Sequence, residues 1–144
     1  MKYALIPVLV ALAVGVAWLI ERRRRTDAPT QAAWSVPAQL DRGDFDRPSA
    51  PWLVAVFTSS TCQTCSGVAQ KAAVLECVEV AVAEVEVGSH KDLHTRYGID
   101  AVPTTVVADA QGVVRKSWLG PVTATDLWAG VAALRTNTQV DCAE

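Results

Sequence analysis

The sequence predicts an α/β domain with a mixed central sheet flanked by helices, preceded by one transmembrane helix. Three observations support this expectation. Residues 3–20 contain no charged side chain. Residues 52–57 form a continuous apolar run with the length of a buried strand. After this run, segments with the hydrophobic spacing of helices alternate with segments typical of strands, a pattern that indicates an α/β fold.

The composition excludes several classes of protein. The 144 residues suffice for one domain of ordinary size, and a content of 51% hydrophobic residues excludes a disordered tail protein. Lys2 and four arginines at 22–25 against Glu21 give residues 1–25 a net charge of +4. Because the whole chain carries −2, residues 26–144 carry −6. An acidic domain of this kind indicates no nucleic-acid groove.

Residues 3–20 are predicted to form an anchor in the lipid bilayer, with a basic flank that extends to residue 25. As a helix, these eighteen residues would cover about 27 Å, which is close to the thickness of the hydrocarbon core. A cleaved signal peptide is the alternative, but the run ends in Trp18 and four arginines rather than in a small-residue cleavage site. The positive-inside rule predicts that the chain after Ile20 is cytoplasmic.

The rest of the chain divides into a linker, a compact domain and a tail. Residues 26–51 are rich in proline and small polar residues, which predicts a linker with one short strand near residues 36–40. The compact domain is expected to span residues 52–136. Residues 137–144 are then a C-terminal tail.

Hydrophobic periodicity predicts the elements of the compact domain. The strand at 52–57 is followed by a helix that starts near Cys62. Ser89 and Thr123 each stand three residues before an aspartate, which is the spacing of a capping box, and each is expected to open a further helix. Further strands are expected at residues 78–87, 104–108 and 113–119, the last two as a hairpin with its turn at residues 109–112.

Cys62 and Cys65 form a C-x-x-C motif at the predicted strand-to-helix junction. Unpaired N–H groups and the helix dipole favour an anion there, so the thiol of Cys62 is expected to ionise readily. A thiolate at Cys62 can attack a disulfide, and Cys65 can then resolve the mixed disulfide. The motif thus predicts thiol–disulfide exchange without an organic cofactor, because the dithiol itself carries the two electrons.

Between about Val36 and Arg135, several positions match a known family in chain order: Phe57, Cys62, Cys65, residues 97–99, residues 102–104 and Gly120. On these positions the segment resembles the thioredoxin family. The resemblance implies a thioredoxin-like fold with five strands, dithiol–disulfide exchange with protein substrates, and a dithiol electron donor or acceptor as partner. It also implies a cis peptide bond before Pro103, where the backbone of Val102 would bind an extended substrate chain.

The chain departs from the usual motif of that family at several positions. Thr61 stands where the family has a tryptophan, and residues 63–64 are Gln-Thr instead of Gly-Pro. The buried aspartate that commonly assists the resolving cysteine falls at Val56. Water or another group must therefore move the proton of Cys65. The first helix of the usual fold is expected to be reduced to a loop at residues 42–51.

Two other functions are compatible with the same residues. A zinc-binding module could combine the cysteine pair with His90 and His94, although 24 residues separate the two halves. A redox-inactive adaptor with a thioredoxin-like fold is the second alternative. The glutamates at 79, 84 and 86 are expected at the solvated edge or end of a strand, so no metal ligand is predicted among them. Cys77 is expected to be a buried, inert thiol.

Overall fold

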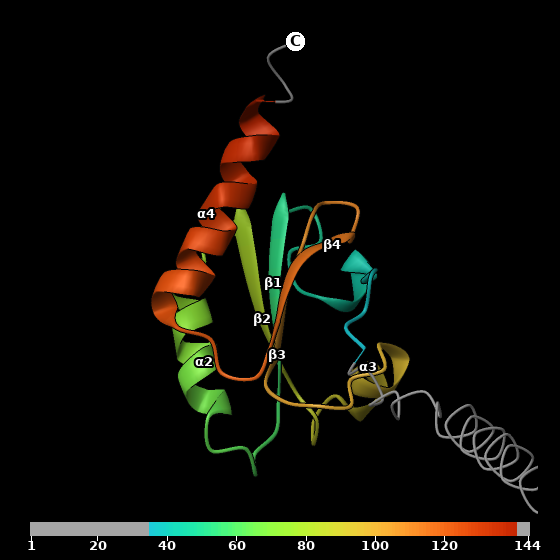
Figure 1. Cartoon of the computed structure of the whole chain (residues 1–144). Coiled ribbons are helices and arrows are strands. Elements are labelled where there is room, and N and C mark those ends of the chain that lie inside the picture. The colour runs from blue at the N-terminus through green and yellow to red at the C-terminus, as the bar shows by residue number, and fades with distance from the viewer. Residues whose placement is uncertain (1–34, 141–144) are drawn as a thin grey trace, which may run out of the picture. The chain divides into compact units, whose positions relative to one another are not determined.

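The computed structural model describes residues 35–140, with side chains up to residue 136. These residues form a four-stranded sheet with helices on both faces (Figure 1). In chain order the elements are η1 (Arg42–Asp44), β1 (Trp52–Thr58), α2 (Cys65–Ala73), β2 (Val80–Glu86), α3 (Lys91–Arg96), β3 (Thr104–Ala108), β4 (Val114–Leu119) and α4 (Ala124–Val140). The strand order is β2-β1-β3-β4, in which β1 and β2 are parallel and the other pairs are antiparallel. The predicted α/β fold with a mixed sheet is confirmed.

Strand β1 lies at the centre of the fold because both of its faces are apolar. All seven of its residues are buried, as expected for a strand covered on both sides. Val54 and Val56 belong to the core shared with α2 and α4. Leu53, Ala55 and Phe57 face the other core, which includes residues of α3 and of the chain before β1. The chain that leaves the end of β1 is therefore anchored by both halves of the core.

The strand expected near residues 36–40 is absent from the described structure. Only Gln39 pairs there, with Val113, in an isolated antiparallel bridge. Pro37 has no N–H to donate, and the chain turns into η1 directly after Leu40, so the pairing cannot extend in either direction. Among the described residues the sheet thus has four strands, not the five that the resemblance implied.

Residues 42–51, which are predicted to be a loop in place of the family's first helix, contain only the short η1, and this segment packs against the sheet. Leu40, Phe45 and Ala50 are part of the core. Arg42 is only 8% exposed and donates hydrogen bonds to the carbonyls of Ala50 at 2.9 Å and Asp109 at 2.8 Å. Its guanidinium group therefore ties this segment to the turn between β3 and β4.

The two predicted capping boxes have different outcomes. The Thr123 hydroxyl accepts the N–H of Asp126 at 3.1 Å and donates to its carboxylate at 2.7 Å, which confirms the cap of α4. The prediction for Ser89 is wrong, because α3 starts after His90 without a side-chain cap. The N–H and hydroxyl of Ser89 donate instead to the carboxylate of Glu86. Because Ser89 binds the carboxylate of Glu86, it does not cap α3.

Strand β2 begins two residues later than expected. Val78 is 87% exposed and, together with Cys77, lies in a bend before the strand. The guanidinium group of Arg47 donates to the carbonyls of Cys77 at 2.6 Å and Val78 at 2.9 Å, which holds this bend in place. The expectation of a buried thiol at Cys77 is also wrong, since this free cysteine is exposed.

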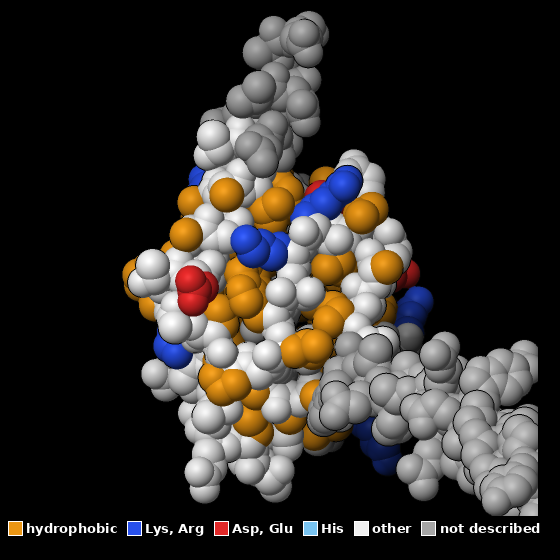
Figure 2. Space-filling model, in the orientation of Figure 1, with side chains coloured by type: hydrophobic (Ala, Val, Ile, Leu, Met, Phe, Trp, Pro, Cys, Tyr) orange, Lys and Arg blue, Asp and Glu red, His pale blue; other side chains and the backbone are white. Residues whose placement is uncertain are grey.

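Strand β4 forms one edge of the sheet and presents charged side chains to solvent. Arg115 and Lys116 are exposed, and the ammonium group of Lys116 lies 5.5 Å from the ring centroid of Trp118. Figure 2 shows hydrophobic side chains over α4 and β4 with Lys and Arg side chains beside them. Charges on an edge strand oppose pairing with another chain.

The part of the chain described by the structure, residues 35–140, contains no helix long and apolar enough to cross a membrane. The transmembrane helix predicted at residues 3–20 lies outside these residues.

Candidate active site

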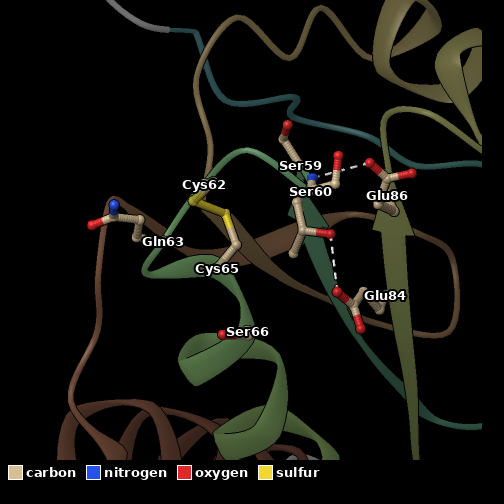
Figure 3. A pocket seen from close by; sticks show the side chains of 9 residues that line it. Ser59, Ser60, Cys62, Gln63, Cys65, Ser66, Glu84 and Glu86 are labelled. Atoms are coloured by element: carbon tan, nitrogen blue, oxygen red, sulfur yellow. Dashed lines mark hydrogen bonds between the residues drawn. A yellow bond between two sulfur atoms is a disulfide. The ribbon is translucent and has the colours of Figure 1, made fainter.

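The cysteine pair lies where β1 passes into α2, as the sequence predicts. The turn after β1 is closed by a hydrogen bond from the Cys62 N–H to the carbonyl of Ser59 at 3.0 Å. Cys65 is the first residue of α2. The two sulfur atoms form a disulfide, which Figure 3 shows at the start of this helix.

The two cysteines differ in exposure. Cys65 is 2% exposed, whereas Cys62 is half-buried. The sulfur of Cys62 lies 3.7 Å from the hydroxyl oxygen of Thr64, which can donate a weak hydrogen bond to it. An incoming sulfur atom can therefore reach Cys62 more readily than Cys65.

A pocket of about 330 Å³ opens beside the disulfide, and two of its lining residues are carboxylates of β2. The sequence pattern predicts Glu84 and Glu86 only at a solvated strand edge or end and does not predict their part in this pocket. Their place at the end of a strand could have indicated it, because parallel strands bring their carboxyl ends to the same edge of a sheet. The lining residues of this disulfide pocket are Thr58, Ser59, Ser60, Cys62, Gln63, Cys65, Ser66, Glu84 and Glu86.

The carboxylate of Glu86 organises the loops on both sides of the disulfide pocket. It accepts a hydrogen bond from the N–H of Ser60 at 3.1 Å and another from the N–H of Ser89 at 3.0 Å. Hydrogen bonds from the backbone of Gly88, then Ser60 and Ser89, lower the pKa of Glu86 below its ordinary value of 4.5. The ionised side chain therefore holds the chain before Cys62 next to the loop after β2.

Replacing Glu86 with glutamine is expected to lower the melting temperature at neutral pH. Because the folded-state pKa of Glu86 is depressed, its contribution is complete above pH 4.5 and is lost as the pH falls through the lower folded-state value. The difference in melting temperature between the two proteins should therefore shrink on acidification. Asp100→Asn, which changes an exposed carboxylate elsewhere, serves as the control. A difference that stays constant down to about pH 2 would contradict this role.

The carboxylate of Glu84 is held by a single side-chain hydrogen bond. The buried hydroxyl of Thr58 donates to its Oε1 at 3.0 Å. In the register of the sheet, Glu84 pairs with Val56, the position where the resemblance would place an aspartate. An acidic side chain thus stands one strand away from that position.

Comparisons with known proteins give structural matches. No protein-family model and no curated protein matches the chain. A mutant thioredoxin from Halobacterium salinarum aligns at 26% identity over 62% of this chain and 80% of its own, with a TM-score of 0.52. Fasciola hepatica thioredoxin aligns at 25% identity over 60% and 83%, also with a TM-score of 0.52. Thioredoxin-2 of the malaria parasite, described as a component of its protein secretion machinery, aligns at 16% identity over 58% of this chain and 82% of its own, with a TM-score of 0.52.

The chain has the thioredoxin-like fold. Its cysteine pair lies at the start of a helix, as in thioredoxins, and the two sulfur atoms are at bonding distance. Fold and cysteine pair together support a role like that of a thiol–disulfide oxidoreductase.

In this thioredoxin-like fold, Val102 and Pro103 lie directly before β3. The peptide bond between them is cis, as the resemblance implies. Thr104 pairs with Phe57 in the sheet, so the start of β3 lies next to the end of β1. The lining of the disulfide pocket includes neither Val102 nor Pro103. Their role in binding a substrate stays a prediction.

The residues of the alternative zinc site are not brought together. Residues 35–140 contain no group of three or more His, Cys, Asp or Glu side chains that could hold a metal ion. His94 is buried, donates from Nε2 to the carbonyl of Val85 at 2.8 Å, and packs edge-on against the ring of Phe57. Its imidazole thus joins α3 to the sheet, while Cys62 and Cys65 are bonded to each other.

Proposed function

We propose that this protein is a membrane-anchored thiol–disulfide oxidoreductase that acts on protein disulfides through Cys62 and Cys65. The observation that carries the proposal is the disulfide between a half-buried Cys62 and a buried Cys65 beside an open pocket. The difference in exposure supports Cys62 as the attacking residue and Cys65 as the resolving residue. The thioredoxin-like fold supports the same chemistry.

The reaction consists of two exchanges between sulfur atoms. The thiolate of Cys62 attacks one sulfur of a substrate disulfide, whose S–S bond breaks and whose other sulfur leaves as a thiolate. Cys65 then attacks the sulfur of Cys62, which forms the intramolecular disulfide and releases the second substrate sulfur. Two electrons pass from the dithiol to the substrate, and a dithiol donor reduces the cysteine pair for the next cycle. No organic cofactor takes part in these steps.

Val102 and Pro103 are proposed to form part of the substrate-binding surface. The position of β3 beside the end of β1 supports this role, because the segment before β3 lies near the turn that carries Cys62. Binding through backbone groups of Val102 would suit extended chains of different sequence.

Turnover of a protein disulfide tests the proposed function. The full chain in detergent is expected to accelerate the reduction of insulin by dithiothreitol, measured as precipitation of the released insulin chain. The rate of dithiothreitol alone is the reference. A rate equal to that reference would favour the redox-inactive adaptor. One bound zinc per chain, measured by metal analysis of the purified protein, would favour the zinc module.

We also propose that residues 3–20 anchor the chain in a lipid bilayer with the catalytic domain on the cytoplasmic side. The uncharged run and the arginines at 22–25 support this arrangement. Alkaline phosphatase fused to the C-terminus is expected to be inactive, since this enzyme needs an oxidising compartment for its disulfides. High phosphatase activity in membranes would place the domain on the opposite side.

A further inference from the structure

The second exchange of the proposed reaction needs a base near Cys65. Cys65 is 2% exposed, and its thiol must lose a proton before its sulfur can attack Cys62. Val56, where the resemblance would place an aspartate that assists Cys65, is apolar and fully buried. The disulfide pocket is lined by Cys65 together with carboxylate side chains, so a group that accepts the proton can come from there.

Two carboxylates line this pocket, and only one has an oxygen free to take a proton. The carboxylate of Glu86 is occupied by the N–H groups of Ser60 and Ser89, and these bonds favour its charged form. Glu84 accepts one hydrogen bond, at Oε1. Within residues 35–136, no side chain or backbone group binds its Oε2.

Glu84 is an exposed residue, but the fold sets its position. Its pairing with Val56 puts it on the α2 side of the sheet, and the buried hydroxyl of Thr58 fixes one oxygen at 3.0 Å. In Figure 3, Glu84 and Glu86 extend from β2 toward the end of β1, with the disulfide across the pocket. A pocket of about 330 Å³ has room for water molecules that bridge the remaining gap.

We propose that Glu84 is the general base for Cys65, a role that rests on the proposed oxidoreductase function. In the mixed disulfide, the carboxylate accepts the proton of the Cys65 thiol through water. The Cys65 sulfur then bonds to the Cys62 sulfur, the bond between Cys62 and the substrate sulfur breaks, and the leaving thiolate takes up the proton from Glu84. Thr58 is a positioning residue in this scheme, because it acts on the carboxylate and not on the sulfur atoms.

The proposal predicts a characteristic pH profile for the second exchange. With a positioned general base, the rate of the second exchange should change little with pH around neutrality, whereas the rate of attack by spontaneously ionised thiol rises about tenfold per pH unit below the thiol pKa. The titratable groups that line the pocket together with Glu84 are Glu86, Cys62 and Cys65. The lining contains no lysine, arginine or histidine, so no cation replaces the carboxylate when it is removed.

The experiment separates the two exchanges in the full chain. Cys77→Ser and Cys142→Ser provide a background in which only the active pair reacts. The reduced protein is mixed with less than one equivalent of dithiobis(nitrobenzoate), a symmetrical aromatic disulfide. The first molecule of coloured thiolate is released when Cys62 attacks, and the second is released when Cys65 resolves the adduct. Stopped-flow absorbance measures both rates between about pH 5 and 8.

Glu84→Gln is expected to slow the second release about tenfold at neutral pH and to make its rate rise steeply with pH, with little change in the first release. Glu84→Asp should restore much of the second rate, and Thr58→Val should slow it in part. Asp100→Asn removes the same charge from an exposed position outside the pocket and is the control, expected to leave the second rate within about twofold.

Two failures of this experiment have different meanings. A background protein that gives no second release would overturn the proposed function, since Cys65 would not resolve the adduct. Two clear releases, with the second unchanged in Glu84→Gln, would overturn only the role of Glu84. An equal slowing in Glu84→Gln and Asp100→Asn would also overturn it, because the effect would follow the net charge of the protein and not the base.

Discussion

Replacing Cys62 with serine is expected to reduce the rate of insulin reduction to that of dithiothreitol alone. Cys62 is the more exposed member of the pair, and no disulfide can be attacked once its sulfur is gone. Cys65→Ser should also stop turnover, but after the first exchange. When the reduced variant is mixed with substrate proteins without dithiothreitol, mixed disulfides should accumulate and be visible on non-reducing gels.

Mixed disulfides should form with Cys65→Ser but not with Cys62→Ser, and this difference identifies the attacking cysteine. Cys77→Ser is the control, because Cys77 is an exposed thiol in the bend before β2, and it should keep full turnover. Faster alkylation of Cys65 than of Cys62 in the reduced protein at neutral pH would show that the assignment of the attacking cysteine is wrong.

Gly112→Ala is expected to destabilise the fold by about 3 kcal/mol. Gly112 has a φ of +81°, and a Cβ atom there would lie 2.0 Å from the backbone oxygen of Leu40. The carbonyl oxygen of Gly112 also accepts a hydrogen bond from the Leu40 N–H at 2.8 Å. The substitution would therefore push the segment before β1 away from the hairpin, in addition to straining the turn. Urea denaturation monitored by circular dichroism measures the loss.

Substitutions at two other glycines show how much of the loss at Gly112 comes from backbone strain and how much from the contact with Leu40. Gly120 also has a positive φ, of +85°, but nothing lies within 4 Å of a Cβ there, so Gly120→Ala should cost only about 1 to 2 kcal/mol. Gly67, in α2, has open space around it, and Gly67→Ala should stabilise the helix by about 0.5 to 1 kcal/mol. If Gly112→Ala cost no more than Gly120→Ala, the close packing of Leu40 on this turn would be in doubt.

Much of the fold could be predicted because its signals are local. The apolar run of β1, the spacing of the hairpin strands β3 and β4, and the capping box at Thr123 each depend on residues close in sequence. The cysteine pair is equally local, since its position at a strand-to-helix junction follows from the residues on either side.

Predictions failed where a distant or competing partner decided the outcome. Ser89 has the same capping pattern as Thr123, but the carboxylate of Glu86 is close enough to bind it first. The segment at 36–40 has strand-like residues, but it finds one pairing position, at Gln39, before the chain turns away. Hydrophobic periodicity alone predicts neither the hydrogen bond between Ser89 and Glu86 nor the early end of the pairing at Gln39.

The sequence by itself determined the α/β class, the order of most elements and the identity of the redox pair, because these depend on spacing along the chain. Only the tertiary structure decided what surrounds that pair. Glu84 stands 19 positions after Cys65 in the chain, and it reaches the disulfide pocket because β2 pairs in parallel with β1 in one particular register. Register depends on how both faces of the sheet are packed, and a shift of one residue would turn Glu84 toward the opposite face.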